Sequence, residues 1–152
     1  RIVVNSGGKS ERYMKGIYPE LPSQAFIHYG NAIGDTMQLA EDLNVPRLTI
    51  GLMLGKAVKL AEGHLDTHSH KITLNRTFLS QVARDNNCSI TTLELIAKMN
   101  MARELWRGLP HEDACRFFPA LLKLCYNHCS RIYHGELEAV LIDDDGIIRY
   151  RI

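Results

Sequence analysis

Residues 47–65 read RLTIGLMLGKAVKLAEGHL, an apolar run that passes directly into a helical pattern. The first eight residues are almost wholly apolar, as expected of a strand that is covered on both faces. From Gly55 onward the apolar residues recur at the spacing of a helix. A strand that leads straight into a helix is typical of a βαβ unit, so this stretch predicts a parallel sheet.

The same order of strand, turn and helix occurs twice before this stretch. Ile2–Val4 and Ala25–Tyr29 are short apolar runs, and each is followed by a turn that contains glycine. The patterns after them predict one helix with Ser10 as its N-cap and another with Asn31 as its N-cap. Three such units predict an α/β fold that is Rossmann-like, with a mainly parallel sheet flanked by helices.

The second half of the chain has mostly helical periodicity. We expect helices over 74–87, 90–108 and 111–135. The second of them places Met101 on its apolar face, and Pro119 predicts a kink or a break in the third. The chain closes with two apolar runs around Asp-Asp-Asp-Gly, which is a strong signal for a β-hairpin. The fold class is therefore α/β with a helical second half and a C-terminal β-hairpin.

Length, charge and cysteine content exclude several classes of protein. The chain has 152 residues, which we expect to form one domain over residues 1–152. Its 18 basic and 17 acidic residues give a net charge of +1, which is unlike a nucleic-acid-binding protein. No apolar run approaches the roughly 18 residues of a membrane span, and we expect no signal peptide. The four cysteines lack the spacing of a disulfide framework, which favours a reducing, cytoplasmic location.

Small polar turns follow the three predicted strands. Ligands of open α/β sheets bind at the carboxyl ends of the strands, and helix N-termini offer free N–H groups to anions. The three turns therefore predict one shared pocket for an anionic ligand. Their residues are Ser6, Gly7, Gly8 and Lys9 in the first turn, Gly30 and Asn31 in the second, and Gly55 and Lys56 in the third. The run GGKS lacks the first glycine of a phosphate loop at the proper distance, so we reject a Walker motif.

Lys56 and Lys59 are three residues apart and share one face of the predicted helix. Such a pair is either a solvated lysine pair or a clamp for carboxylates or phosphates. Two cations at the start of a helix oppose its dipole, and a bound anion would relieve that small cost.

Three histidines follow the same helix, at positions 64, 68 and 70. His64 and His68 have the spacing of a zinc-binding pair if the helix continues, but the glutamate of the HExxH motif is missing. The alternative is a polar helix exit, in which Thr67 or Ser69 caps the segment that follows.

Two cysteines of the second half are a further candidate for a metal site. Cys125 and Cys129 lie one turn apart on a predicted helix, with His128 nearby. Their spacing matches no standard zinc pattern. The sequence leaves open both a metal site and a packed helix with half-buried thiols.

Four runs of sequence carry a family resemblance. They are SGGKSERY at 6–13, YPELPSQAFIHYGN at 18–31, GNAIGDTMQLA at 30–40 and GKAVKLAEGHLDTHS at 55–69. In this order and at this separation they resemble the CbiD family, the cobalt-precorrin-5B C(1)-methyltransferases of the anaerobic corrin pathway. The resemblance is close over residues 2–70 and weaker through the helical second half.

Members of this family are longer than the chain, and their amino-terminal half has no counterpart in it. A strand that begins at Ile2 without a starting methionine agrees with this difference. We therefore expect residues 1–152 to be the carboxyl-terminal domain of a longer CbiD-like protein, inactive when isolated. The segment His70–Leu74 departs from the family pattern, which leaves open a divergent or fused member.

The resemblance implies methyl transfer from S-adenosylmethionine to a ring carbon of a cobalt-precorrin. The protein would align donor and carbon, exclude water and handle one proton. The donor is expected either on this piece or on the amino-terminal half. Cobalt would arrive inside the substrate, so no protein-bound metal is expected. The expected partners are the cobalt-precorrin and the amino-terminal half of the same protein, without nucleic acid or membrane, and a homo-oligomer stays open.

The resemblance also implies roles for single residues. His68 becomes the candidate catalytic residue that handles the proton. Lys56 and Lys59 become candidates for gripping the carboxylates of the precorrin. The candidate binding residues are Gly30, Asn31, Gly34, Gly55, Lys56, Lys59, Thr67 and Ser69, together with the first turn at 6–9. The alternative function is a non-catalytic module that binds an anionic corrinoid within a larger or fused enzyme.

Overall fold

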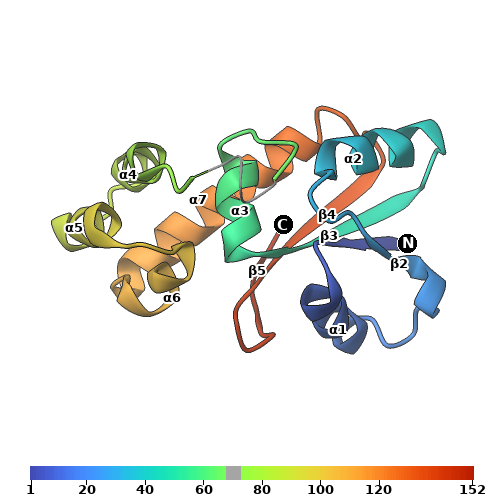
Figure 1. The fold of residues 1–152 in the computed structure, drawn as a ribbon, viewed down its shortest axis with the longest axis horizontal. Coiled ribbons are helices and arrows are strands. Elements are labelled where there is room, and N and C mark those ends of the chain that lie inside the picture. The colour runs from blue at the N-terminus through green and yellow to red at the C-terminus, as the bar shows by residue number, and fades with distance from the viewer. Residues whose placement is uncertain (68–72) are drawn as a thin grey trace.

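The computed structural model describes residues 1–67 and 73–152, and this part of the chain forms one five-stranded sheet with helices on both faces (Figure 1). The strands are β1 (Ile2–Asn5), β2 (Phe26–His28), β3 (Arg47–Met53), β4 (Glu136–Ile142) and β5 (Ile148–Arg151). Their order in the sheet is β2-β1-β3-β4-β5. The first four are parallel, and β5 pairs antiparallel with β4. The predicted α/β class, mainly parallel sheet and C-terminal hairpin are confirmed.

The helices that follow the strands cover the two faces of the sheet unequally. One face carries α1 (Gly8–Ile17) (Figure 1). The other face carries α2 (Ile33–Asp42), α3 (Leu54–Ala61) and α7 (His111–Cys129). The chain leaves β1 and β3 toward opposite faces, and this difference positions the candidate site described below.

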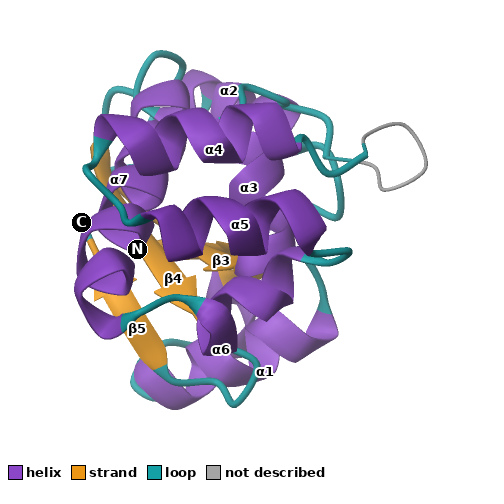
Figure 2. Cartoon of the chain, turned by 90° about the vertical axis from the view of Figure 1, so that its left-hand side faces the viewer, coloured by secondary structure: helices purple, strands orange, loops and turns teal. Residues whose placement is uncertain are grey.

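A group of shorter helices lies beyond α3 and α7, and Figure 2 views it from the front. Its members are α4 (Arg76–Asp85), α5 (Ile90–Lys98), the 3₁₀ turn η2 (Ala102–Glu104) and α6 (Leu105–Gly108). A further 3₁₀ turn, η1 (Ser23–Ala25), precedes β2. The helical second half is thus confirmed, and none of the described helices is long and apolar enough to cross a membrane.

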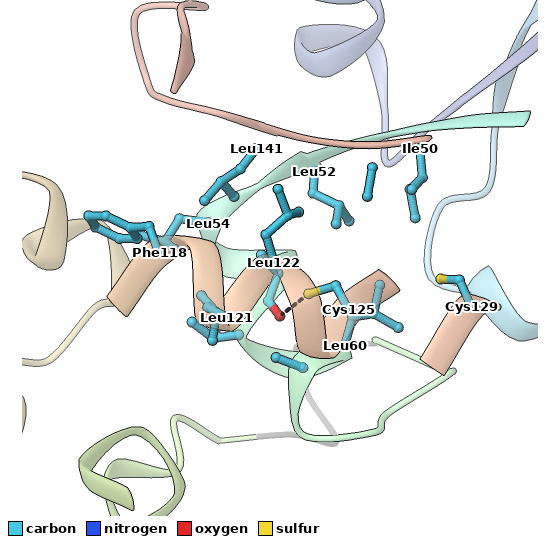
Figure 3. Packing of buried hydrophobic residues seen from close by; sticks show 14 of the residues in the cluster. Ile50, Leu52, Leu54, Leu60, Phe118, Leu121, Leu122, Cys125, Cys129 and Leu141 are labelled. Carbon is cyan, nitrogen blue, oxygen red and sulfur yellow. Dashed lines mark hydrogen bonds between the residues drawn. The ribbon is translucent and has the colours of Figure 1, made fainter. Parts of the chain in front are cut away.

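β3 is the central strand on which both layers pack. Leu48, Ile50 and Leu52 belong to the larger core, against α3 and α7 (Figure 3). Burial of each such side chain stabilises the fold by about 2 kcal/mol. On the other face, a Cβ atom at Gly51 would lie 2.8 Å from Cγ of Met14 in α1. Glycine therefore lets the fully buried Met14 pack onto the strand, which is covered on both faces as predicted.

Both predicted N-caps are wrong. Ser10 lies inside the first turn of α1, where its hydroxyl donates a hydrogen bond to the carbonyl oxygen of Gly7 at 2.9 Å. Asn31 lies one residue before the N-cap position of α2, which Ala32 occupies, and its side chain accepts a hydrogen bond from Lys56. Both residues are of the capping type, and contacts elsewhere decide where their side chains bond.

The predicted helix over 90–108 is divided into α5, η2 and α6. The division lies at Met99, whose backbone is extended and whose side chain is buried. The carboxylate of Glu104 accepts hydrogen bonds from the N–H groups of Asn100 and Met101, each at 2.8 Å, and so caps the start of η2. Met101, predicted on the apolar face, has a side chain that is 52% exposed.

α7 runs without interruption through Pro119. A proline inside a helix leaves the carbonyl group four residues earlier without its helical donor. That residue is Cys115, and both Cys115 and Pro119 are exposed, so water can bond to the free carbonyl. The predicted break is therefore absent.

Candidate functional site

The carboxyl ends of β1 and β3 lie side by side. Asn5, the last residue of β1, is in register with Gly51 of β3. After β1 the chain enters α1 on one face of the sheet, and after β3 it enters α3 on the other (Figure 1). Such a switch point opens a crevice at the carboxyl edge of an α/β sheet. The turn at 29–32 reaches the same edge, because β2 is parallel to β1.

Four predicted site residues meet beside this edge. Nζ of Lys56, in the first turn of α3, donates a hydrogen bond to Oδ1 of Asn31 in the turn before α2. It also donates to Oγ1 of Thr67 at 3.1 Å and to the carbonyl oxygen of Thr67 at 3.3 Å. Lys59, one turn further along α3, donates to the same carbonyl oxygen at 3.2 Å. We call Asn31, Lys56, Lys59 and Thr67 the lysine cluster.

Main-chain contacts hold residues 65–67 against the start of α2. The N–H group of Thr67 donates to the carbonyl oxygen of Asn31 at 2.9 Å, and that of Gly34 donates to the carbonyl oxygen of Leu65 at 3.1 Å. A Cβ atom at Gly34 would lie 2.9 Å from Cβ of Leu65. Because Gly34 has no Cβ atom, the segment that carries Thr67 can pack closely against it.

The lysine cluster places two positive charges along one side of α3. Burial lowers the pKa of the Lys56 amine, the charge of Lys59 lowers it further, and the Asp66 carboxylate acts in the opposite direction. The three acceptors around Lys56 match the three protons of an ammonium group, so its charged form is fully hydrogen-bonded. Two neighbouring cations favour an anion within reach.

A cleft of about 640 Å³ opens beside the lysine cluster, between α3 and the group formed by α4 and η2. This volume lies within the roughly 300–1,000 Å³ that is common for small-molecule sites. Three predicted residues, Gly55, Lys56 and Lys59, line its α3 side. The other side is lined by residues before and within α4, around η2 and in the β4–β5 hairpin: Leu74, Asn75, Phe78, Leu79, Asn100, Met101, Ala102, Arg103 and Asp144.

Little in the sequence indicates this second wall. Phe78, Met101 and Arg103 come from segments whose periodicity indicates core helices. Met101 and Arg103 line the cleft only because the chain leaves the axis of α5 and begins η2 there. The available signal was Asn100 followed by Glu104, a turn-forming residue and then a carboxylate that can cap a new helix start.

The family model described as "CbiD, C-terminal domain" matches residues 66–151, which is more than half of the chain. The chain belongs to the CbiD family. The matched region is mainly the helical second half, whereas the motifs that carry the resemblance lie before residue 70. The relationship therefore extends over both halves of the chain.

Curated relatives named cobalt-precorrin-5B C(1)-methyltransferase match most of this chain. The protein of Prosthecochloris aestuarii is 35% identical over 97% of this chain and 41% of its own length. The protein of Thermus thermophilus is 30% identical over 89% of this chain and 37% of its own length. The protein of Priestia megaterium is 29% identical over 82% of this chain and 34% of its own length. The chain thus spans about two fifths or less of the length of these relatives, and no solved structure matches it.

The first predicted turn, at 6–9, does not line the cleft. The N–H group of Gly7 donates to Oγ of Ser10 at 3.3 Å, so this turn bonds to its own helix. Nζ of Lys9 lies 5.8 Å from the ring centre of Tyr13, also in α1. Within the described residues, no hydrogen bond joins this turn to the lysine cluster.

The second predicted turn borders a different cleft. Asn31 and Gly34 line a cleft of about 570 Å³ on the α2 side, together with Leu65. Gly30 has φ +58°, a left-handed conformation that favours glycine, and lines neither cleft. The three predicted turns therefore do not meet in one shared pocket. The third turn lines the first cleft, Asn31 of the second turn borders the second cleft, and the first turn bonds to its own helix. The Asn31–Lys56 hydrogen bond connects the two clefts.

The predicted catalytic residue His68 and its neighbour Ser69 lie outside the described residues. α3 ends at Ala61, before His64, because Gly63 takes a left-handed conformation with φ +101°. The helix that would place His64 and His68 on one face is therefore not formed at His64. Its ring instead lies 3.2 Å from the carboxylate of Glu62.

Cys125 and Cys129 are buried where α7 packs against α3 (Figure 3). Sγ of Cys125 donates a hydrogen bond to the carbonyl oxygen of Ala57 at 3.2 Å. Burial raises the pKa of both thiols, and that of Cys129 to about 12. Metal binding uses the thiolate, so these packed thiols favour the structural interpretation. In residues 1–67 and 73–152, no group of three or more His, Cys, Asp or Glu side chains is placed to hold a metal ion.

Proposed function

We propose that this CbiD domain is the substrate-holding part of a cobalt-precorrin methyltransferase. Its cleft beside the lysine cluster would bind the edge of the precorrin that carries carboxylates. The names of the curated relatives support the substrate class. The observation that carries the proposal is that one cleft joins the cations Lys56 and Lys59 to an apolar wall with Phe78 and Met101.

The chemistry of the cleft matches a ligand with two different surfaces. A precorrin combines a broad ring with carboxylate side chains on its edge. The ring would lie against Phe78 and Met101, and it would cover a Met101 side chain that is 52% exposed. The carboxylates would pair with Lys59 and with Arg103, because charge-assisted hydrogen bonds to carboxylates are the strong ones.

For the whole protein we propose methyl transfer from S-adenosylmethionine to a ring carbon of the precorrin. The donor carries a positive sulfonium, and the cleft is lined by the cations Lys56, Lys59 and Arg103. Of the carboxylates that line it, Glu62 already accepts a hydrogen bond from Asn75. The three cations outnumber the two carboxylates that line the cleft, Glu62 and Asp144, which disfavours the sulfonium, and we place the donor elsewhere in the protein.

His68 remains our candidate for handling the proton during transfer. It follows Thr67, whose hydroxyl and carbonyl groups accept hydrogen bonds from Lys56 within the lysine cluster. His68→Ala in the intact protein is expected to lose turnover while the affinity for the precorrin stays. Unchanged turnover would favour the alternative, in which this domain is a non-catalytic module that binds an anionic corrinoid.

Calorimetric titration of the intact protein with two cobalt corrinoids tests the substrate site. One corrinoid carries free carboxylates, and the other carries the same groups as amides. Two charge-assisted contacts predict a preference of ~100-fold for the carboxylate form, and the preference should shrink at high salt. Equal affinity for the two corrinoids would contradict the proposal.

The same titration, repeated with single-residue variants, tests where the corrinoid binds. Arg103→Gln and Phe78→Ala are each expected to lower the affinity for the carboxylate corrinoid by ~10-fold. Arg84→Gln is the matched control, because Arg84 is exposed on α4 and does not line the cleft. If S-adenosylhomocysteine competes with the corrinoid and Arg103→Gln abolishes this competition, the donor binds in the cleft. That result would overturn the placement of the donor outside it.

A further inference from the structure

We infer that the two lysines of α3 have different tasks: Lys56 is a positioning residue that fixes residues 65–67, and Lys59 is the amine that contacts the ligand. The task of Lys56 follows from contacts within the chain. The task of Lys59 rests on the proposed function, because it names the cation that meets the carboxylates of the precorrin.

All donors of Lys56 are already engaged. An ammonium group has three protons and no acceptor. The Lys56 amine has three acceptors around it, which are Oδ1 of Asn31 and the hydroxyl and carbonyl oxygens of Thr67. A ligand carboxylate could bond to Lys56 only by displacing one of these groups. Lys56 is therefore bonded like a structural cation, although it lines the cleft.

Lys59 is oriented by the same cluster but has donors to spare. Within the described residues, its one hydrogen bond goes to the carbonyl oxygen of Thr67, at 3.2 Å. Two of its three protons therefore have no acceptor among residues 1–67 and 73–152. Because Lys59 lines the cleft and is fixed at one point, a carboxylate can bond to it without breaking the cluster.

The Lys56 amine joins three segments that are distant in sequence. It connects α3 to the turn before α2 through Asn31, and to residues 65–67 through Thr67. Thr67 is 1% exposed, so its hydroxyl depends on partners within the protein. Those partners are Lys56 and the carbonyl oxygen of Asn31, at 3.4 Å. Loss of Lys56 would leave buried acceptors unpaired and release the segment that lines the second cleft.

Hydrogen exchange without ligand tests the task of Lys56 in the intact protein. Lys56→Met should raise the exchange rate of the Thr67 and Gly34 amides by ~10-fold or more, because hydrogen bonds to a charged group are lost. Thr67→Val should have the same effect, and Thr67→Ser, which keeps the hydroxyl, should stay near the wild type. Lys59→Met should change these rates by less than ~3-fold.

Titration with the carboxylate corrinoid then tests the task of Lys59. Lys59→Met should weaken binding by ~10-fold or more and leave the amide exchange unchanged. Lys56→Met should weaken binding because the released segment carries the carbonyl group that orients Lys59, so Thr67→Val should weaken it equally and Thr67→Ser should retain it. In the Thr67→Val background, Lys56→Met should add little, whereas Lys59→Met should weaken binding further.

The outcomes separate this inference from the proposed function. If Lys56→Met lowers corrinoid affinity without faster exchange at Thr67, both lysines contact the ligand and the inference is overturned. If the wild type binds the corrinoid and Lys59→Met binds equally well, the task of Lys59 is overturned alone. If the wild type does not bind it while exchange behaves as expected, the proposed function and the task of Lys59 fail, and the task of Lys56 is upheld.

Discussion

Oδ2 of Asp113, in the first turn of α7, lies 2.6 Å from the hydroxyl of Ser89 at the start of α5. The same oxygen accepts from the Ser89 N–H group at 2.9 Å and from the hydroxyl of Thr92 at 2.6 Å. Oδ1 pairs with Arg116 at 2.9 Å. Asp113 is 1% exposed, so one buried carboxylate joins the two helices. It thereby supports the helical group that forms one wall of the cleft.

Asp113→Asn should destabilise the fold by about 2–3 kcal/mol, because a buried acceptor of several charge-assisted hydrogen bonds loses its charge. Urea unfolding at neutral pH measures this difference. Glu112→Gln is the matched control, since Glu112 is the exposed neighbour in the same turn, and it should change stability by less than about 0.5 kcal/mol. Equal effects of the two substitutions would show that the contacts of Asp113 with α5 do not contribute to the stability of the fold.

The same carboxylate makes stability depend on pH. Burial opposes its charge, but hydrogen bonds from Ser89, Thr92 and Arg116 outweigh burial and lower the pKa of Asp113 from 3.8 to about 2. Because the folded pKa is the lower one, this stabilisation is complete above about pH 4 and is lost as the pH falls toward about 2. Across this pH window, the free energy of unfolding should fall by about 2 kcal/mol less in Asp113→Asn than in the wild type. If the free energy of unfolding of both proteins changed with pH in parallel, this would contradict the lowered pKa of Asp113.

Gly34→Ala should destabilise the fold by about 1–3 kcal/mol, because the added Cβ would lie 2.9 Å from Cβ of Leu65. The substitution should also speed exchange at the Thr67 amide, since residues 65–67 would have to move away from α2. Gly16→Ala is the matched control in α1, where a Cβ meets no atom within 4 Å. It should be stabilising by about 0.5–1 kcal/mol. A stabilising Gly34→Ala would show that the close approach of Leu65 is not required.

The four thiols should react in an order set by exposure and pKa. Cys115 is exposed, and burial raises the pKa of the half-buried Cys88 and of the buried Cys125 and Cys129. With an aromatic disulfide reagent, Cys115 should react first, Cys88 slowly, and the other two only on unfolding. Mass spectrometry of the labelled peptides identifies each site. Labelling of Cys125 in the folded protein at the rate of Cys115 would contradict the packing of α7 on α3.

The fold could largely be predicted from the sequence, because its determinants are local. The apolar run of β3 and the helical spacing after it indicate a βαβ unit without knowledge of any contact. The errors arose where a distant residue decided the outcome. Asn31 is a suitable N-cap, but Lys56 of α3 engages its side chain. Periodicity alone also could not show that the chain turns at Met99.

The candidate site could be predicted only in part. The family motifs indicate Asn31, Lys56, Lys59 and Thr67, and these residues do meet in one cluster. The opposite wall with Phe78 could not be predicted, because it forms only when the helical group packs beside α3. A division of tasks between two lysines three residues apart likewise depends on acceptors that only the folded chain brings together.

Hydrogen exchange of the intact protein with and without the carboxylate corrinoid tests the location of the substrate site most directly. We expect protection in the first turns of α3 and α4 and at residues 100–103, which line the cleft on both sides. Residues 35–38, which border the second cleft, should exchange at the same rate in both samples. Protection confined to residues 35–38 or to the turn at 6–9, with α3 unchanged, would contradict the assignment of the cleft beside the lysine cluster.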